Sequence, residues 1–150
     1  MKDAEAQLQS FVEKFDEDNQ VLIGQIRSAL QRRLAGCAEL VWDNYNFFVI
    51  GYSPTERPSD YIVSIAASAA GVSLSFNNGA GLPDPDKILL GSSKVNRFLR
   101  LPSADVLREP KVEAMLDRAI QASPVPQPWQ GGGKLVIRSV SAKQRPRRRS

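Results

Sequence analysis

The chain has 150 residues, of which 42% are hydrophobic and 24% charged, a size and composition typical of one globular domain. No run of about 18 apolar residues occurs, and the first fifteen residues lack the apolar core of a secretory signal, so neither a membrane span nor secretion is expected. The single Cys37 has no partner for an internal disulfide, which favours a reducing, cytoplasmic location.

The net charge of +4 is unevenly distributed. Residues 134–150 contain seven Lys and Arg and no acid, whereas the preceding chain has 13 basic and 16 acidic residues. The simpler interpretation of this basic arm is a solvated, disordered tail. The alternative is a weak contact of residues 143–149 with nucleic acid or an acidic partner, because Lys and Arg displace counterions from phosphates.

Helical spacing of apolar residues comes first along the chain. Two amphipathic helices are predicted, the second ending at Gly36. Their apolar positions are Leu8, Phe11, Val12 and Phe15 in the first, and Leu22, Ile26, Ala29, Leu30 and Leu34 in the second.

Short segments rich in β-branched and aromatic residues follow, and they predict strands. They span 40–45, 47–52, 61–68 and 72–77, with a tight hairpin at 68–71 and a later strand at 97–101. Short connections favour an antiparallel sheet. Asp84 followed by Pro85 predicts the start of a short helix over 86–90.

The remaining chain predicts helix, linker and arm. Residues 103–107 and 110–122 are helical in pattern, 123–133 are a Pro/Gly linker, and the segment after Lys134 is either a late strand or an extended arm. The predicted fold is α+β: two N-terminal helices, an antiparallel sheet of about five strands and a C-terminal helix. The domain is placed at 1–122, with the linker at 123–133 and the arm at 134–150.

Three segments together resemble a known family: VWDNYNFFVIGYS (41–53), RPSDYIVSIAASAAGVSLSFNNGAGLPDPDKILLGSSKVNRFLRL (57–101) and SVSAKQRPRR (139–148). They are similar to the YdhG-like family, domain of unknown function 1801, over roughly residues 20–122 and the tail. That family usually has a Gly-Thr-Gly-Lys type loop where Ser92 and Ser93 stand here, so one glycine is lost. The resemblance implies a small α+β domain of unassigned function. One branch is labelled a frataxin-like iron chaperone, which makes an intracellular iron carrier one alternative.

The sequence favours a non-enzymatic protein without a cofactor. It has no histidine, which removes the usual base near neutral pH and imidazole metal ligands. The GGGK at 131–134 is followed by Leu135 and is therefore not a phosphate-binding loop of the Walker type. Cys37 has no evident activating base near it in sequence.

Two further clusters have both a functional and a structural interpretation. The carboxylates Glu13, Asp16, Glu17 and Asp18 are the only candidates for a hard cation, but a solvated helix end explains them, so no metal site is predicted. Trp42 and Tyr45 could form a pocket for a flat ligand, although packing in the core is the commoner role of aromatic residues.

The predicted binding site is the loop that precedes the last strand of the sheet. Gly91, Ser92 and Ser93 are small, so backbone N–H groups can approach an anion, while Lys94 and Arg97 supply positive charge. The sequence therefore predicts a binding domain for an anionic small molecule or phosphate at 91–97. The competing interpretation is that Gly91 ends a helix and Lys94 is solvated.

Overall fold

The computed structural model describes residues 3–130 and 132–149. Its α-helices are α1 (Ala4–Val12), α2 (Glu17–Arg33) and α3 (Pro110–Gln121). Its strands are β1 (Ala38–Asp43), β2 (Phe48–Ser53), β3 (Val63–Ser68), β4 (Gly71–Phe76), β5 (Arg97–Arg100) and β6 (Leu135–Val140). Short 3₁₀ helices are η1 (Pro58–Asp60), η2 (Gly79–Gly81) and η3 (Ala104–Arg108). Over these residues, no helix is both long enough and apolar enough to cross a membrane.

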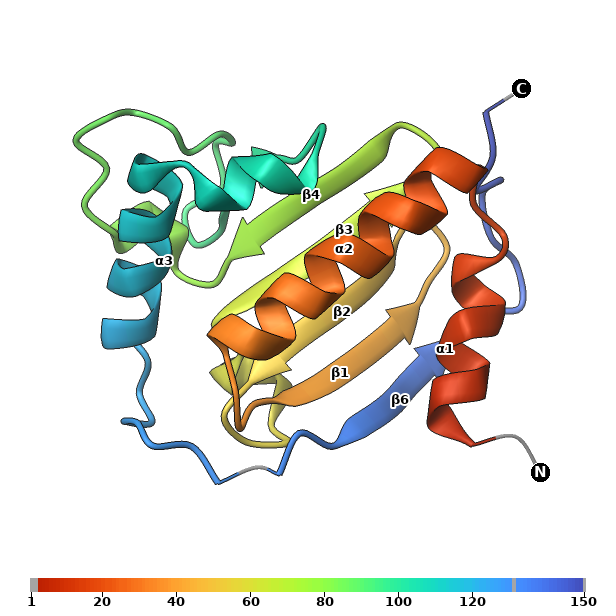
Figure 1. The fold of residues 1–150 in the computed structure, drawn as a ribbon, viewed down its shortest axis with the longest axis horizontal. Coiled ribbons are helices and arrows are strands. Elements are labelled where there is room, and N and C mark those ends of the chain that lie inside the picture. The colour runs from red at the N-terminus through yellow and green to blue at the C-terminus, as the bar shows by residue number, and fades with distance from the viewer. Residues whose placement is uncertain (1–2, 131, 150) are drawn as a thin grey trace.

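The strands form one sheet in the order β5-β4-β3-β2-β1-β6. Every pairing is antiparallel except that of β6 with β1, which is parallel. Figure 1 shows α2 lying across one face of this sheet, with α1 on its β6 side and α3 at the opposite side. The predicted α+β class is confirmed, with six strands instead of about five.

Both N-terminal helices form where the apolar spacing predicts them. The Asp3 side chain begins α1 by accepting a hydrogen bond of 2.7 Å from the Ala6 amide. After α2, Gly36 adopts a φ of +95°, and a Cβ there would lie 2.4 Å from the carbonyl oxygen of Trp129. Glycine is therefore required at this position both by backbone conformation and by the close approach of a distant segment.

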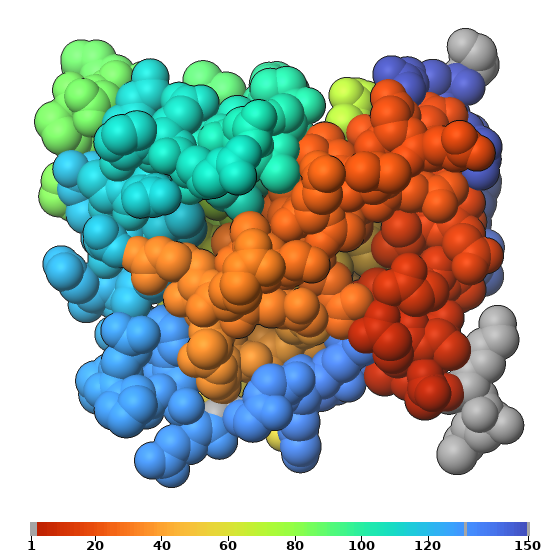
Figure 2. Space-filling model, in the orientation of Figure 1, coloured from red at the N-terminus to blue at the C-terminus, as the bar shows by residue number. Residues whose placement is uncertain are grey.

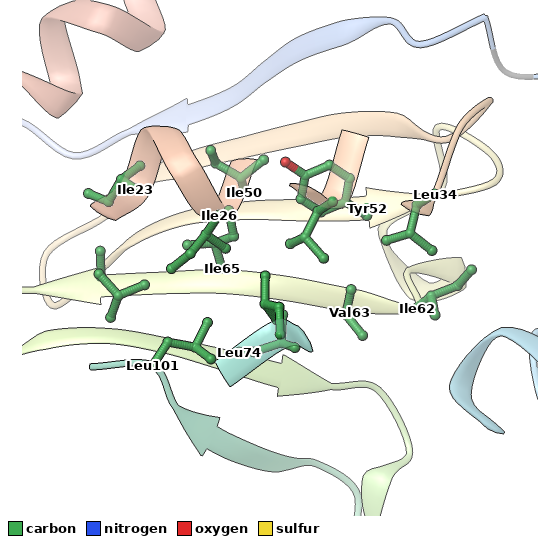
Figure 3. Packing of buried hydrophobic residues seen from close by; sticks show 14 of the residues in the cluster. Ile23, Ile26, Leu34, Ile50, Tyr52, Ile62, Val63, Ile65, Leu74 and Leu101 are labelled. Carbon is green, nitrogen blue, oxygen red and sulfur yellow. The ribbon is translucent and has the colours of Figure 1, made fainter. Parts of the chain in front are cut away.

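The core lies between the helices and one face of the sheet. In β4, Val72, Leu74 and Phe76 are buried toward the helices, while the intervening serines face the other way. Figure 3 shows Ile23 and Ile26 of α2 over the central strands, which contribute Ile50 and Ile65 to the same core. Burying each such side chain contributes about 1.5–3 kcal/mol, so this layer supplies most of the driving force for folding.

The prediction of a short helix after Asp84 is wrong. Asp84 instead closes a turn, because its Oδ1 and Oδ2 accept hydrogen bonds of 3.0 Å from the amides of Ile88 and Leu89. The chain then extends, and Leu90 forms an isolated bridge with Phe98. A side chain that satisfies two amides locally removes the need for a helical turn there.

The predicted linker and separate arm also need correction. Trp129, inside the predicted linker, is only 7% exposed and belongs to the core, with its Nε1 donating to the Val125 carbonyl at 3.0 Å. β6 then joins the sheet beside β1. Both segments are therefore part of the domain, which does not end at residue 122. Gly131 of the linker and Ser150 of the arm lie outside the described residues.

Candidate functional site

The predicted anion loop at 91–97 is exposed and is bonded mainly to itself. Residues 91–96 are all exposed, and Arg97 donates from Nη1 to the carbonyl oxygens of Ser93 and, at 3.0 Å, Asn96. The Ser93 hydroxyl accepts from two amides of the same loop. Arg97 thus holds the loop's shape through the carbonyl groups of Ser93 and Asn96.

Gly91, the first residue of that loop, has a specific structural role. Its φ is +108°, and a Cβ added to it would approach the Phe98 ring at 3.3 Å. Glycine thus permits both the left-handed turn and the contact with β5. The competing interpretation placed the end of a helix at Gly91, but residues 87–89, directly before it, are not helical. The side chains of Ser92 and Lys94 are exposed to solvent.

Trp42 and Tyr45 do not meet in a pocket. Trp42 is partly buried on the sheet face opposite the helices, where its ring lies 3.3 Å from the position of a Cβ on Gly51. Tyr45 is 42% exposed in the turn after β1, with the Arg145 guanidinium 5.4 Å from its ring centroid. The two aromatic side chains have separate surroundings.

The acidic cluster at the start of α2 contacts the C-terminal segment. Asp16 accepts from the backbone N–H of Arg149 at 3.2 Å and from its Nε at 2.9 Å, and Asp18 accepts from its Nη2 at 2.9 and 3.0 Å. The Arg149 amide, followed by its guanidinium, lowers the pKa of Asp16 below its usual value. Within residues 3–130 and 132–149, no group of three or more His, Cys, Asp or Glu is placed to hold a metal.

A different site is built on the sheet face that lacks helices. The strand registers align Val49, Ala66, Ser73 and Arg100 in one row across β2 to β5. Side chains alternate between the faces of a strand, so this row lies opposite the core. In the same way Gly51, Ser64, Ser75 and Phe98 form the neighbouring row. Most of these residues are small, which leaves a shallow floor; we call this surface the open face.

A groove of about 790 Å³ runs from the open face over the tip of the β3–β4 hairpin. Small hairpin residues form its floor: Ala66, Ser68, Ala70, Gly71, Ser73 and Ser75. Larger apolar side chains line it: Leu22, Phe47, Val72, Phe98, Leu101 and Pro102. Its polar lining comprises Asp18, Asn19, Arg100 and Arg149. We call this the hairpin groove. In Figure 1 the hairpin tip, the start of α2 and the C-terminal segment lie at the same end of the molecule.

Two arginines give the hairpin groove its positive charge. Arg149 is already paired with Asp16 and Asp18. Arg100 is exposed, its guanidinium lies 5.6 Å from the Phe98 ring centroid, and it forms no ion pair within the part of the chain that the structure describes. A guanidinium stacked over an aromatic ring keeps its planar edge free for a carboxylate or phosphate.

The residues of the hairpin groove were only partly visible in the sequence. In β4 the buried Val72, Leu74 and Phe76 alternate with the partly buried Ser73 and Ser75, and this alternation is a local signal for a strand with one less buried face. The pair Phe98 and Arg100 has the same spacing of two, which was a usable signal that these side chains share a face. Which face it is, and which strand lies beside it, depends on the register and could not be read locally.

A buried polar network on the helix side of the sheet has a structural role. Glu39 accepts from the Tyr52 hydroxyl at 2.7 Å and from Arg27 at 2.9 Å, and Arg27 also binds Glu5 at 2.8 Å. Burial, and then the Glu39 charge, raise the pKa of Tyr52. Burial also raises the pKa of the neighbouring Cys37 thiol to about 12, which keeps it protonated and unreactive near neutral pH.

No protein-family model, curated protein or solved structure matches this chain. The resemblance to the YdhG-like family therefore stays a prediction.

Proposed function

We propose that this protein is a non-enzymatic binding domain for a small amphipathic anion, and that the ligand lies in the hairpin groove and not at the 91–97 loop. The observation that carries the proposal is Arg100, which has no ion pair among the described residues and is stacked on Phe98 beside a floor of small residues. The apolar or aromatic body of a ligand fits against Phe98, and its carboxylate, sulfonate or phosphate can bind the guanidinium of Arg100.

Three observations support binding over catalysis. The sequence has no histidine, the Cys37 thiol is buried with a raised pKa, and the buried carboxylate of Glu39 already accepts from Tyr52, Arg27 and Gln31. None of these groups lines the hairpin groove. A catalytic acid or base must reach the reacting atoms, and the groove offers only Asp18, which is bonded to Arg149.

The two alternatives from the sequence have less support. In the iron-carrier alternative, two of the four candidate carboxylates, Asp16 and Asp18, already bind Arg149. In the nucleic-acid alternative, Arg147 and Arg149 of the arm are engaged by Asp43, Asp16 and Asp18. Phosphate contact through Arg147 or Arg149 would have to displace these carboxylates, which leaves Lys143, Arg145 and Arg148 as the exposed cations of the arm.

The test uses 8-anilinonaphthalene-1-sulfonate and 1-naphthyl phosphate as flat amphipathic anions. We expect saturable binding by fluorescence or calorimetry and a rise of the thermal midpoint by mass action. Arg100→Ala should weaken binding about tenfold or more, because a charge-assisted hydrogen bond contributes about 1.5–3 kcal/mol.

Lys94→Ala is the matched control, because it removes an equally exposed cation from the 91–97 loop. It should leave the affinity unchanged, as should Arg97→Ala if that variant keeps its urea midpoint. Weaker binding in the loop variants with full binding in Arg100→Ala would place the site at 91–97 and contradict the proposal. Failure of both probes to bind the native protein would also contradict it.

A further inference from the structure

A second groove lies on the helix side of the molecule, between α2 and η3. Two adjoining hollows of about 720 and 300 Å³ share Ala29, Arg32, Leu107 and Arg108 in their linings. Figure 2 views this side, with α2 in orange directly beside η3 and α3 in teal. The hollows follow α2 from Val21 to Arg33, a length of about 18 Å at 1.5 Å per helical residue. We call this the α2–η3 groove.

One end of the α2–η3 groove is lined by uncharged and mostly small residues of α2. Val21, Gly24, Gln25 and Ser28 follow one another at helical spacing along the exposed side of α2. Val21 is 59% exposed, and the space that a Cβ on Gly24 would enter is open. An exposed valine beside a glycine and a serine leaves room for the main chain of another segment to approach α2 closely.

The other end of the groove is rich in arginine. Arg32 is exposed and has no ion pair within the described ranges. Arg33 pairs with Asp117 and Arg108 with Asp105, and all four of these side chains are more than one third exposed. Exposed pairs of this kind are weak, so a partner's carboxylates can replace them at little cost.

We propose that the α2–η3 groove binds an acidic segment of a partner protein. The segment's apolar side chain lies against Val21 and Leu107, and its carboxylates bind Arg32 and Arg108. A peptide fits better than nucleic acid, because Asp105 and Glu113 line the same hollows. Nucleic acid carries a phosphate at every nucleotide, whereas a peptide can place single carboxylates at Arg32 and Arg108 and uncharged residues beside the two acids. This interaction is independent of the ligand proposed for the hairpin groove.

The test uses a fluorescein-labelled twelve-residue peptide of three Glu, two Leu and seven Ser and measures fluorescence anisotropy against the full chain. We expect binding that weakens as salt is raised. The double variant Arg32→Ala/Arg108→Ala should weaken it at least tenfold. The matched control, Lys94→Ala/Lys143→Ala, loses the same charge from exposed residues elsewhere and should bind as the native protein does.

A second variant tests the groove without changing charge. Gly24→Leu fills the open space beside α2 and should weaken binding of the peptide. Because leucine favours helix formation more than glycine does, the urea midpoint should stay equal or rise. The proposal is overturned if the labelled peptide does not bind, if the control double variant weakens binding equally, or if Gly24→Leu has no effect. It is also overturned if a twelve-nucleotide single-stranded DNA binds more tightly than the peptide and loses affinity in the Arg32→Ala/Arg108→Ala variant.

Discussion

Asp43 and Arg147 come from β1 and from the C-terminal segment, and both side chains are almost fully buried. Arg147 Nη2 donates to Asp43 Oδ1 at 2.9 Å and to the Asn44 carbonyl at 2.6 Å, and Lys14 binds the other oxygen of Asp43. Arg147 Nε and Nη1 are buried without a hydrogen-bond partner in the described residues. Removing Asp43 would leave the buried Arg147 guanidinium with little compensation, so the stability of the protein should depend strongly on this pair.

Asp43→Ala should lower the free energy of unfolding by about 3–5 kcal/mol, because it leaves the Arg147 guanidinium buried without its counter-ion. The double variant Asp43→Leu/Arg147→Met removes both charges and should recover much of that loss. Urea unfolding measures both, with Asp105→Ala, from an exposed pair, as the control of small effect. An Asp43→Ala midpoint equal to the control's would show that Arg147 is not buried in solution.

Glu5 should make stability depend on pH. The Arg27 guanidinium, followed by Gln9, lowers the pKa of Glu5 from 4.5 to about 2. Because the folded-state pKa is the lower one, the unfolded chain takes up the proton first as pH falls. The stabilisation is complete above about pH 4.5 and is lost as the pH approaches 2.

Urea midpoints between pH 7 and pH 2.5 test this dependence. The native protein should lose stability more steeply below pH 4.5 than Glu5→Gln, which cannot titrate at this position. Other carboxylates, among them Asp16, contribute to both curves equally, so the difference between the two proteins reports Glu5. Parallel curves would mean that the ion pair with Arg27 is not formed in solution.

Among the structural elements, the segment between α3 and β6 differs most from the prediction that its composition gives. Its prolines and glycines predict a linker, yet Trp129 packs into the core and against Gly36 at the end of α2. The segment therefore packs against the turn between α2 and β1, and the chain then enters the sheet as β6. Prolines and glycines determine only that the segment is not helical, and one large apolar side chain determines where it lies.

Trp129→Ala should cost about 3–5 kcal/mol of stability, the usual range for truncating a buried Trp. Its neighbour Gln130 is exposed, and Gln130→Ala should change the free energy of unfolding by less than about 0.5 kcal/mol. Urea unfolding followed by far-ultraviolet circular dichroism measures both without relying on the Trp129 signal. Equal, small effects would restore the flexible-linker interpretation.

At the scale of the whole molecule, the C-terminal segment binds the junction between the first two helices. The segment after β6 contacts the α1–α2 junction through Gln144 with Lys14, Arg148 with the Glu13 carbonyl, and Arg149 with Asp16. The sequence separations of these contacts exceed 100 residues. The positive charge of the arm is thus partly neutralised by the acidic body of the same chain.

Two truncations separate the parts of this contact. A chain ending at Val140 loses the buried Arg147 and should be destabilised by about 3 kcal/mol or more. A chain ending at Arg147 loses only exposed contacts of Arg148 and Arg149 and should lose less than about 1 kcal/mol. Urea midpoints compare the two with the full chain, and equal midpoints in all three would restore the solvated-tail interpretation.

Elements whose signal is local could be predicted from the amino-acid sequence. The apolar spacing of α1, α2 and α3 and the alternation in β4 are properties of consecutive residues, and packing against a single core preserved them. The α+β class followed from the order of these periods. Asp84 shows the limit even of local signals, because a capping residue and a turn residue share the same side-chain chemistry.

The burial of the C-terminal residues and the location of the candidate site depend on long-range packing. Arg147 has the charge of a solvated residue, and it is buried because Asp43, 104 positions earlier, supplies a counter-ion. The hairpin groove exists because register sets Ala66 beside Ser73 and Ser73 beside Arg100. Pairings over such distances depend on the free energy of the assembled core and not on local preference, so no single stretch of sequence encodes them.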